Sequence, residues 1–226
     1  MKPLCGAILI CALSFPFCGG QGLLAAASDR EAEIVVYGGT SAGVIAAIQA
    51  ARLNKEVLLV CPESHLGGMT SGGLGFTDSG HTHVVGGLAR EFYHQVWRKY
   101  QSNVNWRWQE RQEFENKGQG TKAIDDATRT MWTFEPHIAE TVFDEMLAQH
   151  HVEVLRNEWL DRDGGVEVSD SRITSLKMLS GLVVRGAAFV DATYEGDLMA
   201  ASGVPYQVGR ESNSVFGEKW NGVQIS

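Results

Sequence analysis

A short apolar segment that runs directly into glycines, followed by a small-residue helix and a second apolar segment, most constrains the fold of this chain. Residues 34–43 read IVVYGGTSAG, an alanine-rich run with apolar residues at helical spacing follows, and VLLV occupies residues 57–60. This order predicts a strand, a helix and a parallel strand. In such a unit the glycine turn places a helix N-terminus where it can bind the pyrophosphate of a dinucleotide. The first hypothesis is therefore a nucleotide cofactor.

The glycine turn departs from the common G-x-G-x-x-G pattern at its middle position. Gly38 and Gly43 occupy the first and last glycine positions, but Thr40 stands in the middle, with Gly39 beside it. Small residues are expected here because the turn is tight and the backbone must approach both the phosphates and the sheet. A Thr40→Gly change would restore the common pattern and should be tolerated. Gly39→Val should block the phosphates while most of the sheet stays folded.

The acidic residue that usually ends the second strand of such a unit, and binds a ribose hydroxyl, is missing from its position. Cys61 occupies that position, and Glu63 follows two residues later. Glu63 either binds the ribose from a slightly longer loop or is a solvated loop carboxylate. The sequence leaves both alternatives open.

Two further segments carry glycines and carboxylates. Residues 65–78, HLGGMTSGGLGFTD, contain five glycines, so their backbone can approach a flat, extended ligand closely. Residues 188–203, AFVDATYEGDLMAASG, predict a strand that ends at Asp191 and a small-residue helix from about Asp197. Asp197 is also a candidate N-cap for that helix, since a short side-chain oxygen can accept from its free N–H groups.

Together these blocks resemble the FAD-dependent oxidoreductase family, in the branch of secreted bacterial flavoproteins of which some are labelled xanthan lyase-like. The resemblance is carried, in order, by YGGTSAGVIAAIQAAR, HLGGMTSGGLGFTD, EPHIAETVFDEML and FVDATYEGDLMAASG, and it covers nearly all of the chain from Glu33 onward. It implies an α/β fold: a Rossmann-like FAD-binding domain with a parallel sheet, a β-meander and a helical or irregular insertion. It also implies FAD as the cofactor.

The resemblance further implies roles for individual residues. The pyrophosphate loop would comprise Gly38, Gly39, Thr40, Ser41, Ala42 and Gly43. The ribityl and flavin side would be faced by Gly67, Gly68, Met69 and Thr70. A second cofactor-binding loop would contain Asp191 and Asp197, and the residue near the adenine would be Val154. The sequence identifies no catalytic residue.

The N-terminal residues 1–27 predict a secretory signal peptide ahead of a single FAD-binding domain over residues 28–226. Lys2 precedes an apolar run over residues 4–17, and small residues at 23–27 offer a cleavage site before Ser28. The run is shorter than the roughly 20 residues that a membrane-spanning helix needs, so no stable membrane anchor is expected. Lipid attachment at Cys18 is the minor alternative.

Cysteine count and charge exclude several kinds of partner. After cleavage Cys61 is the one remaining cysteine, so the chain can neither ligate an iron–sulfur cluster nor form an internal disulfide. Loss of Lys2 leaves 18 of the 19 basic residues against 27 acidic ones, which gives nucleic-acid binding no electrostatic support. His81 and His83 form an H-x-H pair without a third ligand cluster, so no metal site is expected. The dipeptide His81-Thr82 is likewise not expected to attach a flavin covalently.

Residues 101–133 are polar and contain three tryptophans among charges, and they predict an insertion that caps the cofactor. Ordinary packing of these rings against the main domain is the alternative. Residues 159–184 predict the β-meander, with a turn at residues 163–165. Proteins of this architecture complete the cofactor domain after an inserted substrate domain, so we expect this sequence to lack both the substrate domain and the C-terminal completion.

The leading interpretation is a secreted FAD-dependent oxidoreductase in which the flavin transfers a hydride or electrons to or from a small-molecule or carbohydrate-derived substrate. The alternative is a truncated or non-catalytic FAD-binding module, or a carbohydrate-processing, lyase-like partner. A secreted or periplasmic location follows from the signal peptide in either case.

Export is directly testable. We expect N-terminal sequencing of the exported protein to begin near Ser28, because the apolar run and the small residues before it match a cleavable signal. A cytosolic protein that keeps Met1 would contradict this prediction.

Overall fold

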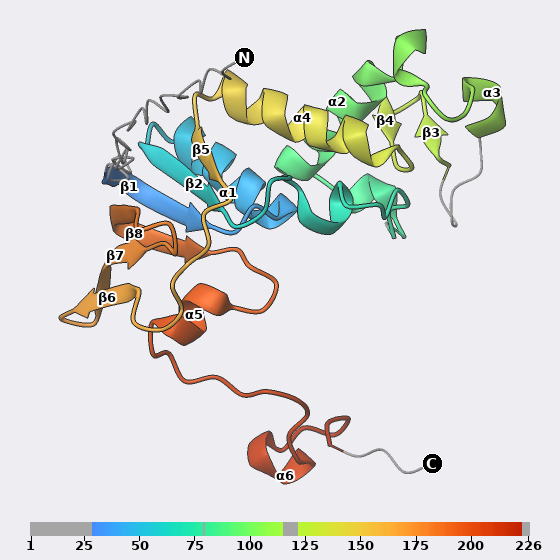
Figure 1. Cartoon of the computed structure of the whole chain (residues 1–226). Helices are drawn as coiled ribbons and strands as arrows, with labels where there is room; N and C mark the ends of the chain where they lie inside the picture. Colours follow the sequence, from blue (N-terminus) through green and yellow to red (C-terminus); the bar gives the residue numbers. More distant parts are fainter. Residues whose placement is uncertain (1–28, 79, 115–121, 223–226) are drawn as a thin grey trace, which may run out of the picture.

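The centre of the molecule is a six-stranded sheet in the order β5-β2-β1-β8-β7-β6 (Figure 1). The computed structural model describes residues 29–78, 80–114 and 122–222, so the predicted signal peptide and Cys18 lie outside the described residues. The strands are β1 (Arg30–Tyr37), β2 (Val57–Cys61), β5 (Glu153–Arg156), β6 (Val166–Ser169), β7 (Arg172–Lys177) and β8 (Val183–Asp191).

Four of these strands run parallel. β1 pairs with β2 on one side and β8 on the other, and β2 pairs in turn with β5. Because β1 is enclosed on both edges and both faces, Val35 and Val36 are fully buried, as is typical of the continuous apolar strands of parallel sheets. Helix α1 (Ser41–Arg52) makes the crossover from β1 to β2. The predicted Rossmann-like α/β fold is confirmed.

The antiparallel part of the sheet is a hairpin, β6-β7, attached to the outer edge of β8. Strands β6, β7 and β8 therefore form a β-meander, as expected, but its third strand also belongs to the parallel sheet. The predicted turn at residues 163–165 leads into β6 and does not join two strands of the hairpin. The hairpin turn lies at Asp170 and Ser171, whose φ angles of 49° and 61° suit the tight turns that connect twisted strands.

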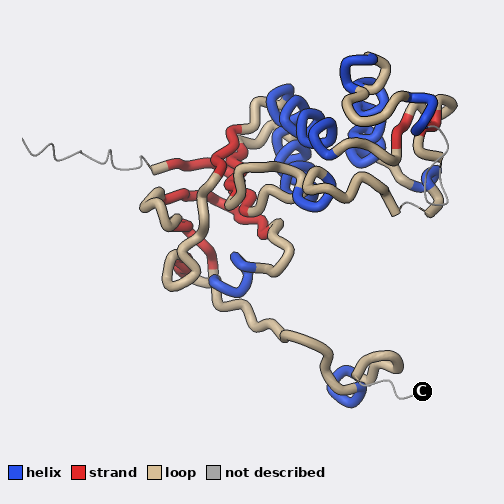
Figure 2. Tube along the Cα trace, turned by 45° about the vertical axis from the view of Figure 1, so that its right-hand side comes forward, coloured by secondary structure: helices blue, strands red, loops and turns tan. Residues whose placement is uncertain are grey.

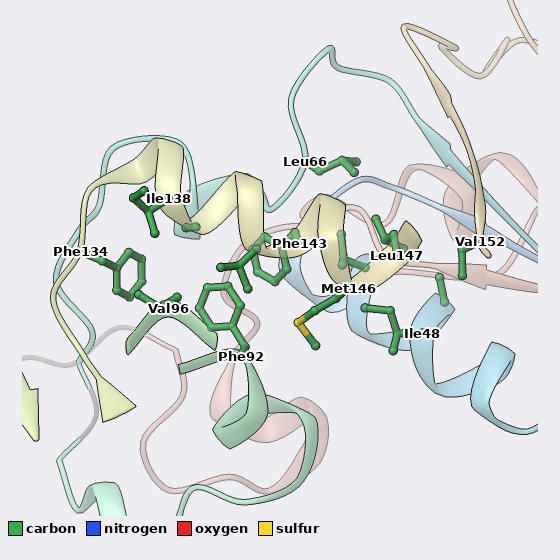
Figure 3. Packing of buried hydrophobic residues seen from close by; sticks show 14 of the residues in the cluster. Ile48, Leu66, Phe92, Val96, Phe134, Ile138, Phe143, Met146, Leu147 and Val152 are labelled. Atoms are coloured by element: carbon green, nitrogen blue, oxygen red, sulfur yellow. The ribbon is translucent and has the colours of Figure 1, made fainter. Parts of the chain in front are cut away.

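Three helices cover one face of the sheet (Figure 1). They are α1, α2 (Gly87–Lys99) and α4 (Pro136–Gln149), and α4 begins with its proline at the first helical position, as predicted. Their apolar faces form one hydrophobic cluster with the sheet (Figure 3). Within it Phe92 of α2 stacks on Phe143 of α4, with ring centroids 4.4 Å apart. This cluster fixes the start of α4 relative to the end of β1.

The other face of the sheet is covered by loops and by the short helix α5 (Asp197–Ala201). A second cluster here contains Tyr37, Met178, Leu182 and Leu198. The Tyr37 hydroxyl accepts a hydrogen bond of 2.9 Å from the backbone N–H of Leu160, which attaches the loop after β5 to the sheet.

The predicted insertion lies beside α2 and α4, on the side away from β8 (Figures 1 and 2). Its described elements are η3 (Asn103–Asn105), α3 (Arg111–Phe114), β3 (Ile124–Asp125) and β4 (Thr130–Met131). Trp132 is buried, and Trp106 packs on Tyr100 with ring centroids 4.6 Å apart, whereas Trp108 is exposed. Two of the three tryptophans thus follow the packing alternative, and a cap over the cofactor stays a prediction.

The last described segment leaves the sheet after α5 and extends away from it to the short helix α6 (Asn213–Phe216) (Figures 1 and 2). Two 3-10 helices, η1 (Gly68–Thr70) and η2 (Thr82–Val84), lie in the loop between β2 and α2. Across the ranges that the structure describes, no helix has the length and apolar character needed to span a membrane.

The contribution of α1 to the core can be measured with a matched pair of substitutions. Ile48→Ala removes a side chain with 0% exposure and should lower the free energy of unfolding by about 2–5 kcal/mol in urea denaturation. Leu53→Ala at the end of the same helix, where the side chain is 65% exposed, should change it by less than about 0.5 kcal/mol. Equal effects would show that α1 does not pack as described.

Candidate functional site

The glycine turn brings three backbone segments into direct contact at the carboxyl ends of β1 and β8. A Cβ at Gly43 would collide with the carbonyl oxygen of Gly38, and a Cβ at Gly38 would lie 2.6 Å from the carbonyl carbon of Ala192. Gly38 also has a φ of +114°, which L side chains rarely adopt. The helix therefore starts directly against the sheet, and neither glycine can be replaced without a backbone shift.

Thr40 at the middle position is the N-cap of α1. Its φ of −67° does not require glycine, and its Oγ1 accepts a hydrogen bond from Gly43 N–H at 3.2 Å. The same hydroxyl donates to the carbonyl oxygen of Ala192 at 2.7 Å. Thr40 thus joins α1 to the end of β8, and a Thr40→Gly change would remove both bonds. The tolerance of this change stays a prediction, because the loss of the cap alone costs little when glycine replaces threonine.

A side chain at Gly39 would point into the core, although the backbone of Gly39 lines the space in front of the turn. A Cβ there would collide with Sγ of Cys61 and lie 2.9 Å from a methyl carbon of Leu66. The expectation that Gly39→Val leaves the sheet folded is therefore wrong, because the valine would displace β2. Burial also raises the pKa of the Cys61 thiol to about 11, so this cysteine stays protonated at neutral pH.

A cavity of about 660 Å³ opens in front of the turn. It lies in the crevice outside the carboxyl ends of β1, β2 and β8, which is where open α/β sheets bind their ligands. Six segments line it: the turn, the loop after β2, the second glycine loop, the start of α4, the loop after β5 and the loop before α5. The lining residues are Gly38, Gly39, Thr40, Pro62, Glu63, His65, Gly68, Ser71, Gly72, Gly73, Pro136, His137, Glu140, Trp159, Thr193, Tyr194, Glu195 and Asp197.

The predicted site residues divide between this cavity and its surroundings. Those that line it are Gly38, Gly39, Thr40, Glu63, Gly68 and Asp197. Ser41, Ala42 and Thr70 line a smaller cavity of about 300 Å³ between α1 and α2. Gly43 and Gly67 are buried next to the turn, and Gly67 N–H donates to the carbonyl oxygen of Gly39 at 2.7 Å. Val154 lies in the middle of β5, where it pairs with Leu59 of β2. Its side chain packs against the hydrophobic cluster beneath the helices.

Glu63 is an exposed carboxylate on the cavity wall, two residues beyond the end of β2. Its Oε2 lies 3.7 Å from Sγ of Cys61, within hydrogen-bonding reach of the thiol. Its position suits a hydroxyl-bearing ligand group in the cavity, while its exposure also fits a solvated carboxylate, so the ribose role stays a prediction.

Asp191, at the end of β8, uses both carboxylate oxygens within its own loop. Oδ1 accepts from the backbone N–H of Thr193 at 2.9 Å and from its hydroxyl at 2.7 Å. Oδ2 accepts from the backbone N–H of Met199 in the first turn of α5 at 2.8 Å. Asp191 thus fixes the loop that leads to α5. The sequence had suggested Asp197 as the residue that caps this helix, but the capping hydrogen bond is made by Asp191.

Asp197 is the first residue of α5 and not its N-cap, which is Gly196 with a φ of 72°. The N–H of Asp197 donates to the hydroxyl of Thr193 at 2.9 Å, and its Oδ1 accepts from Nη1 of Arg162 at 2.9 Å. The N-cap alternative for Asp197 is therefore wrong. Its carboxylate lines the cavity together with that of Glu195.

Tyr194 connects the two loops across the cavity, and the sequence analysis missed it. Its hydroxyl accepts a hydrogen bond of 2.7 Å from the backbone N–H of the exposed Met69. A Cβ at Gly68, whose φ is 53°, would collide with the same hydroxyl. No spacing in the sequence relates residues 125 positions apart, so only the fold could place this tyrosine beside the glycine loop.

The start of α4 also contributes groups that the sequence did not single out. Glu140 accepts from the backbone N–H of Leu66 at 3.1 Å, and its Oε2 lies 3.0 Å from Nδ1 of His65. Nη1 of Arg156 lies 3.4 Å from the other oxygen. This carboxylate fixes the beginning of the second glycine loop on α4.

The histidine pair of the sequence shows no metal-binding geometry. The rings of His81 and His83 have centroids 5.5 Å apart and are tilted by 59°. In the portion of the chain available for description, no group of three or more His, Cys, Asp or Glu residues is arranged to hold a metal ion.

Comparison with known proteins identifies the family of the chain. A model of the family described as FAD dependent oxidoreductase matches residues 33–225. No curated protein sequence matches the chain significantly.

Several solved structures share the fold. L-proline dehydrogenase from P. horikoshii superposes with a TM-score of 0.50 and 19% identity, over 81% of this chain and 59% of that chain. L-amino acid deaminase from Proteus vulgaris gives 0.47 and 16%, over 76% and 49% of the two chains. The 3-ketosteroid-Δ4-(5α)-dehydrogenase from Rhodococcus jostii RHA1 gives 0.43 and 16%, over 75% and 47%. The present chain thus spans less than two thirds of these structures, and at such identity the likeness concerns the fold.

The role of the Thr40 hydroxyl can be tested by substitutions that remove it or keep it. Thr40→Val keeps the side-chain volume but removes the bonds to Gly43 and Ala192, so it should lower the free energy of unfolding by about 1–3 kcal/mol. Thr40→Ser keeps the hydroxyl and should cost less than half as much in the same urea titration. If the two variants unfold alike, the cap does not contribute as the geometry indicates.

Proposed function

The chain belongs to the FAD-dependent oxidoreductase family, and we propose that it oxidises or reduces a small-molecule or carbohydrate-derived substrate with FAD bound in the 660 Å³ cavity. One observation carries the proposal: the Gly38–Gly43 turn places the N-terminus of α1 at the cavity wall. The flavin supplies the hydride- or electron-transfer chemistry when bound. The residues of the chain bind and orient it and shape the space for the substrate.

The cavity fits such a cofactor in its chemistry. The first N–H groups of α1 have no partners within the helix, and together with the helix dipole they favour a phosphate group. Gly68, Gly72 and Gly73 line the cavity without side chains, so a flat ring system can approach their backbone. Glu63 and Asp197 present carboxylate oxygens on the cavity wall, and these can accept from ribose or ribityl hydroxyls.

Apolar groups on the cavity wall would limit the access of water to the bound ring. Pro62 and Trp159 lie toward the end of β2, and Pro136 lies at the start of α4. Such a wall strengthens the hydrogen bonds and charges inside the site, because the local dielectric is lower than that of water. We further propose that the protein acts after export, on the basis of the signal-like pattern of residues 1–27.

A charge placed at the start of α1 tests the phosphate site without removing a buried group. Ala42 is exposed in the first turn of α1, where a carboxylate favours the helix but repels a bound pyrophosphate. Ala42→Glu should therefore weaken FAD binding by about tenfold or more, measured by flavin fluorescence, while thermal stability is unchanged or rises slightly. Ala42→Gln has nearly the same shape without the charge and should bind FAD like the original protein.

The identity of the cofactor is tested by denaturing purified protein and analysing what it releases. We expect a yellow protein that releases FAD. Release of NAD, or FAD affinity that is the same in Ala42→Glu and Ala42→Gln, would contradict the assignment of the phosphate site to this turn.

A further inference from the structure

Glu135 and His137 flank Pro136 at the start of α4. Glu135 is only 8% exposed, although a carboxylate in such a position is costly unless it is hydrogen-bonded. Its Oε1 accepts from the backbone N–H groups of Arg107 at 3.3 Å and Trp108 at 3.0 Å. Its own backbone N–H donates to the hydroxyl of Tyr100 at 2.7 Å. The carboxylate is therefore held in a fixed position.

The second carboxylate oxygen points to His137. Oε2 of Glu135 is buried and, among the described residues, has no hydrogen bond in the present side-chain geometry. Nδ1 of His137 lies 3.3 Å from it. A small rotation of the imidazole would align an Nδ1–H with Oε2 and satisfy this buried acceptor. A neutral histidine that donates through Nδ1 exposes Nε2 as a hydrogen-bond acceptor.

His137 lines the main cavity next to Pro136, which also lines a second cavity. Its partly exposed ring lines the main cavity together with Gly72 and Gly73. A second cavity of about 380 Å³ shares Gly73 and Pro136 with the first, and Phe76 and Phe134 give it a largely apolar wall. The two walls are held together by backbone bonds, such as that from Phe134 N–H to the carbonyl oxygen of Gly75 at 2.9 Å.

We propose that Glu135 is a positioning residue that holds His137 in its Nδ1–H form. In that form Nε2 of His137 accepts a hydrogen bond from the hydroxyl or amino group of a substrate whose apolar part occupies the 380 Å³ cavity. This assignment rests on the proposed function and adds a substrate class to it: apolar alcohols or amines. In their oxidation one C–H leaves as hydride to the flavin, the O–H or N–H proton passes to Nε2, and a C=O or C=N bond forms.

The tautomer of His137 is measurable without any substrate. In the full chain labelled with ¹⁵N-histidine, NMR should show His137 with a protonated Nδ1 and an unprotonated Nε2, with the signals assigned by their loss in His137→Gln. A His137 that is protonated at Nε2 and bare at Nδ1 overturns the proposal. The measurement does not depend on bound FAD, so failure of this inference and failure of the cofactor assignment are distinguishable.

A substitution at the carboxylate tests its positioning role. In Glu135→Gln the side-chain amide can donate to Nδ1, so the tautomer of His137 should reverse, whereas a purely structural carboxylate would leave it unchanged. Glu140→Gln is the matched control, because Glu140 pairs with His65 and should leave the signals of His137 as they were. If Glu135→Gln does not fold, the tautomer of the original protein still decides the question.

The substrate class is tested with cyclohexanol, which combines an apolar ring with one hydroxyl. Titration into the full chain should shift the Nε2 resonance of His137, and methylcyclohexane, which has no donor, should shift it at least fivefold less. An Nε2 resonance that stays unchanged while cyclohexanol saturates the apolar cavity, followed through the ring resonances of Phe76 and Phe134, would overturn the assignment.

Discussion

The close approach of three backbone segments at Gly38, Gly43 and Ala192 is the constraint on which the rest of this structure depends. Gly38 follows β1, Gly43 lies in the first turn of α1, and Ala192 follows β8. A side chain at either glycine would meet backbone atoms of its neighbours, so the helix can lie against the sheet only because both side chains are missing. The hydroxyl of Thr40 then ties the start of α1 to Ala192. The N-terminus of the helix is thereby held at the mouth of the cavity.

The cavity wall is a continuation of this contact. Beyond Ala192 the loop is held by the carboxylate of Asp191, and this fixed loop carries Tyr194 to the backbone N–H of Met69. On the other side Glu140 fastens the beginning of the glycine loop to α4. The first part of that loop, from Leu66 to Met69, is thus attached to neighbouring elements, although the loop contains five glycines, whose ordering costs more backbone entropy than that of other residues. The hydrogen bonds from neighbouring elements offset this cost.

The parts of the fold that follow from local rules could be predicted from the sequence. The β1-α1-β2 unit follows from the apolar periodicity around the glycine turn, and the start of α4 follows from Pro136 at its first position. The direction in which a loop side chain points could not be predicted in this way. Gly39 faces Cys61 and the core, although its neighbours face the cavity, because a turn rotates successive residues by amounts that only the tertiary contacts set.

The same limit applies to the two carboxylates of the third motif. Asp191 and Asp197 are six residues apart, and either could cap the following helix by its chemistry. The structure gives the capping bond to Asp191, because the loop turns back through Gly196 and brings the N–H of Met199 to its Oδ2. Asp197 is left on the cavity wall, paired with Arg162. Residue type therefore predicted a capping carboxylate in this loop, and loop geometry decided that Asp191 provides it.

The distribution of charge around the cavity restricts how an FAD molecule can lie in it. Carboxylates line the wall at Glu63, Glu140, Glu195 and Asp197. Glu140 is paired with Arg156 and Asp197 with Arg162, whereas Glu63 and Glu195 would repel a pyrophosphate placed beside them. The N-terminus of α1 is the part of the wall that favours an anion. In the binding mode that we propose, the phosphates would therefore lie against the glycine turn, and the hydroxyl-bearing parts of the cofactor would lie beside the carboxylates.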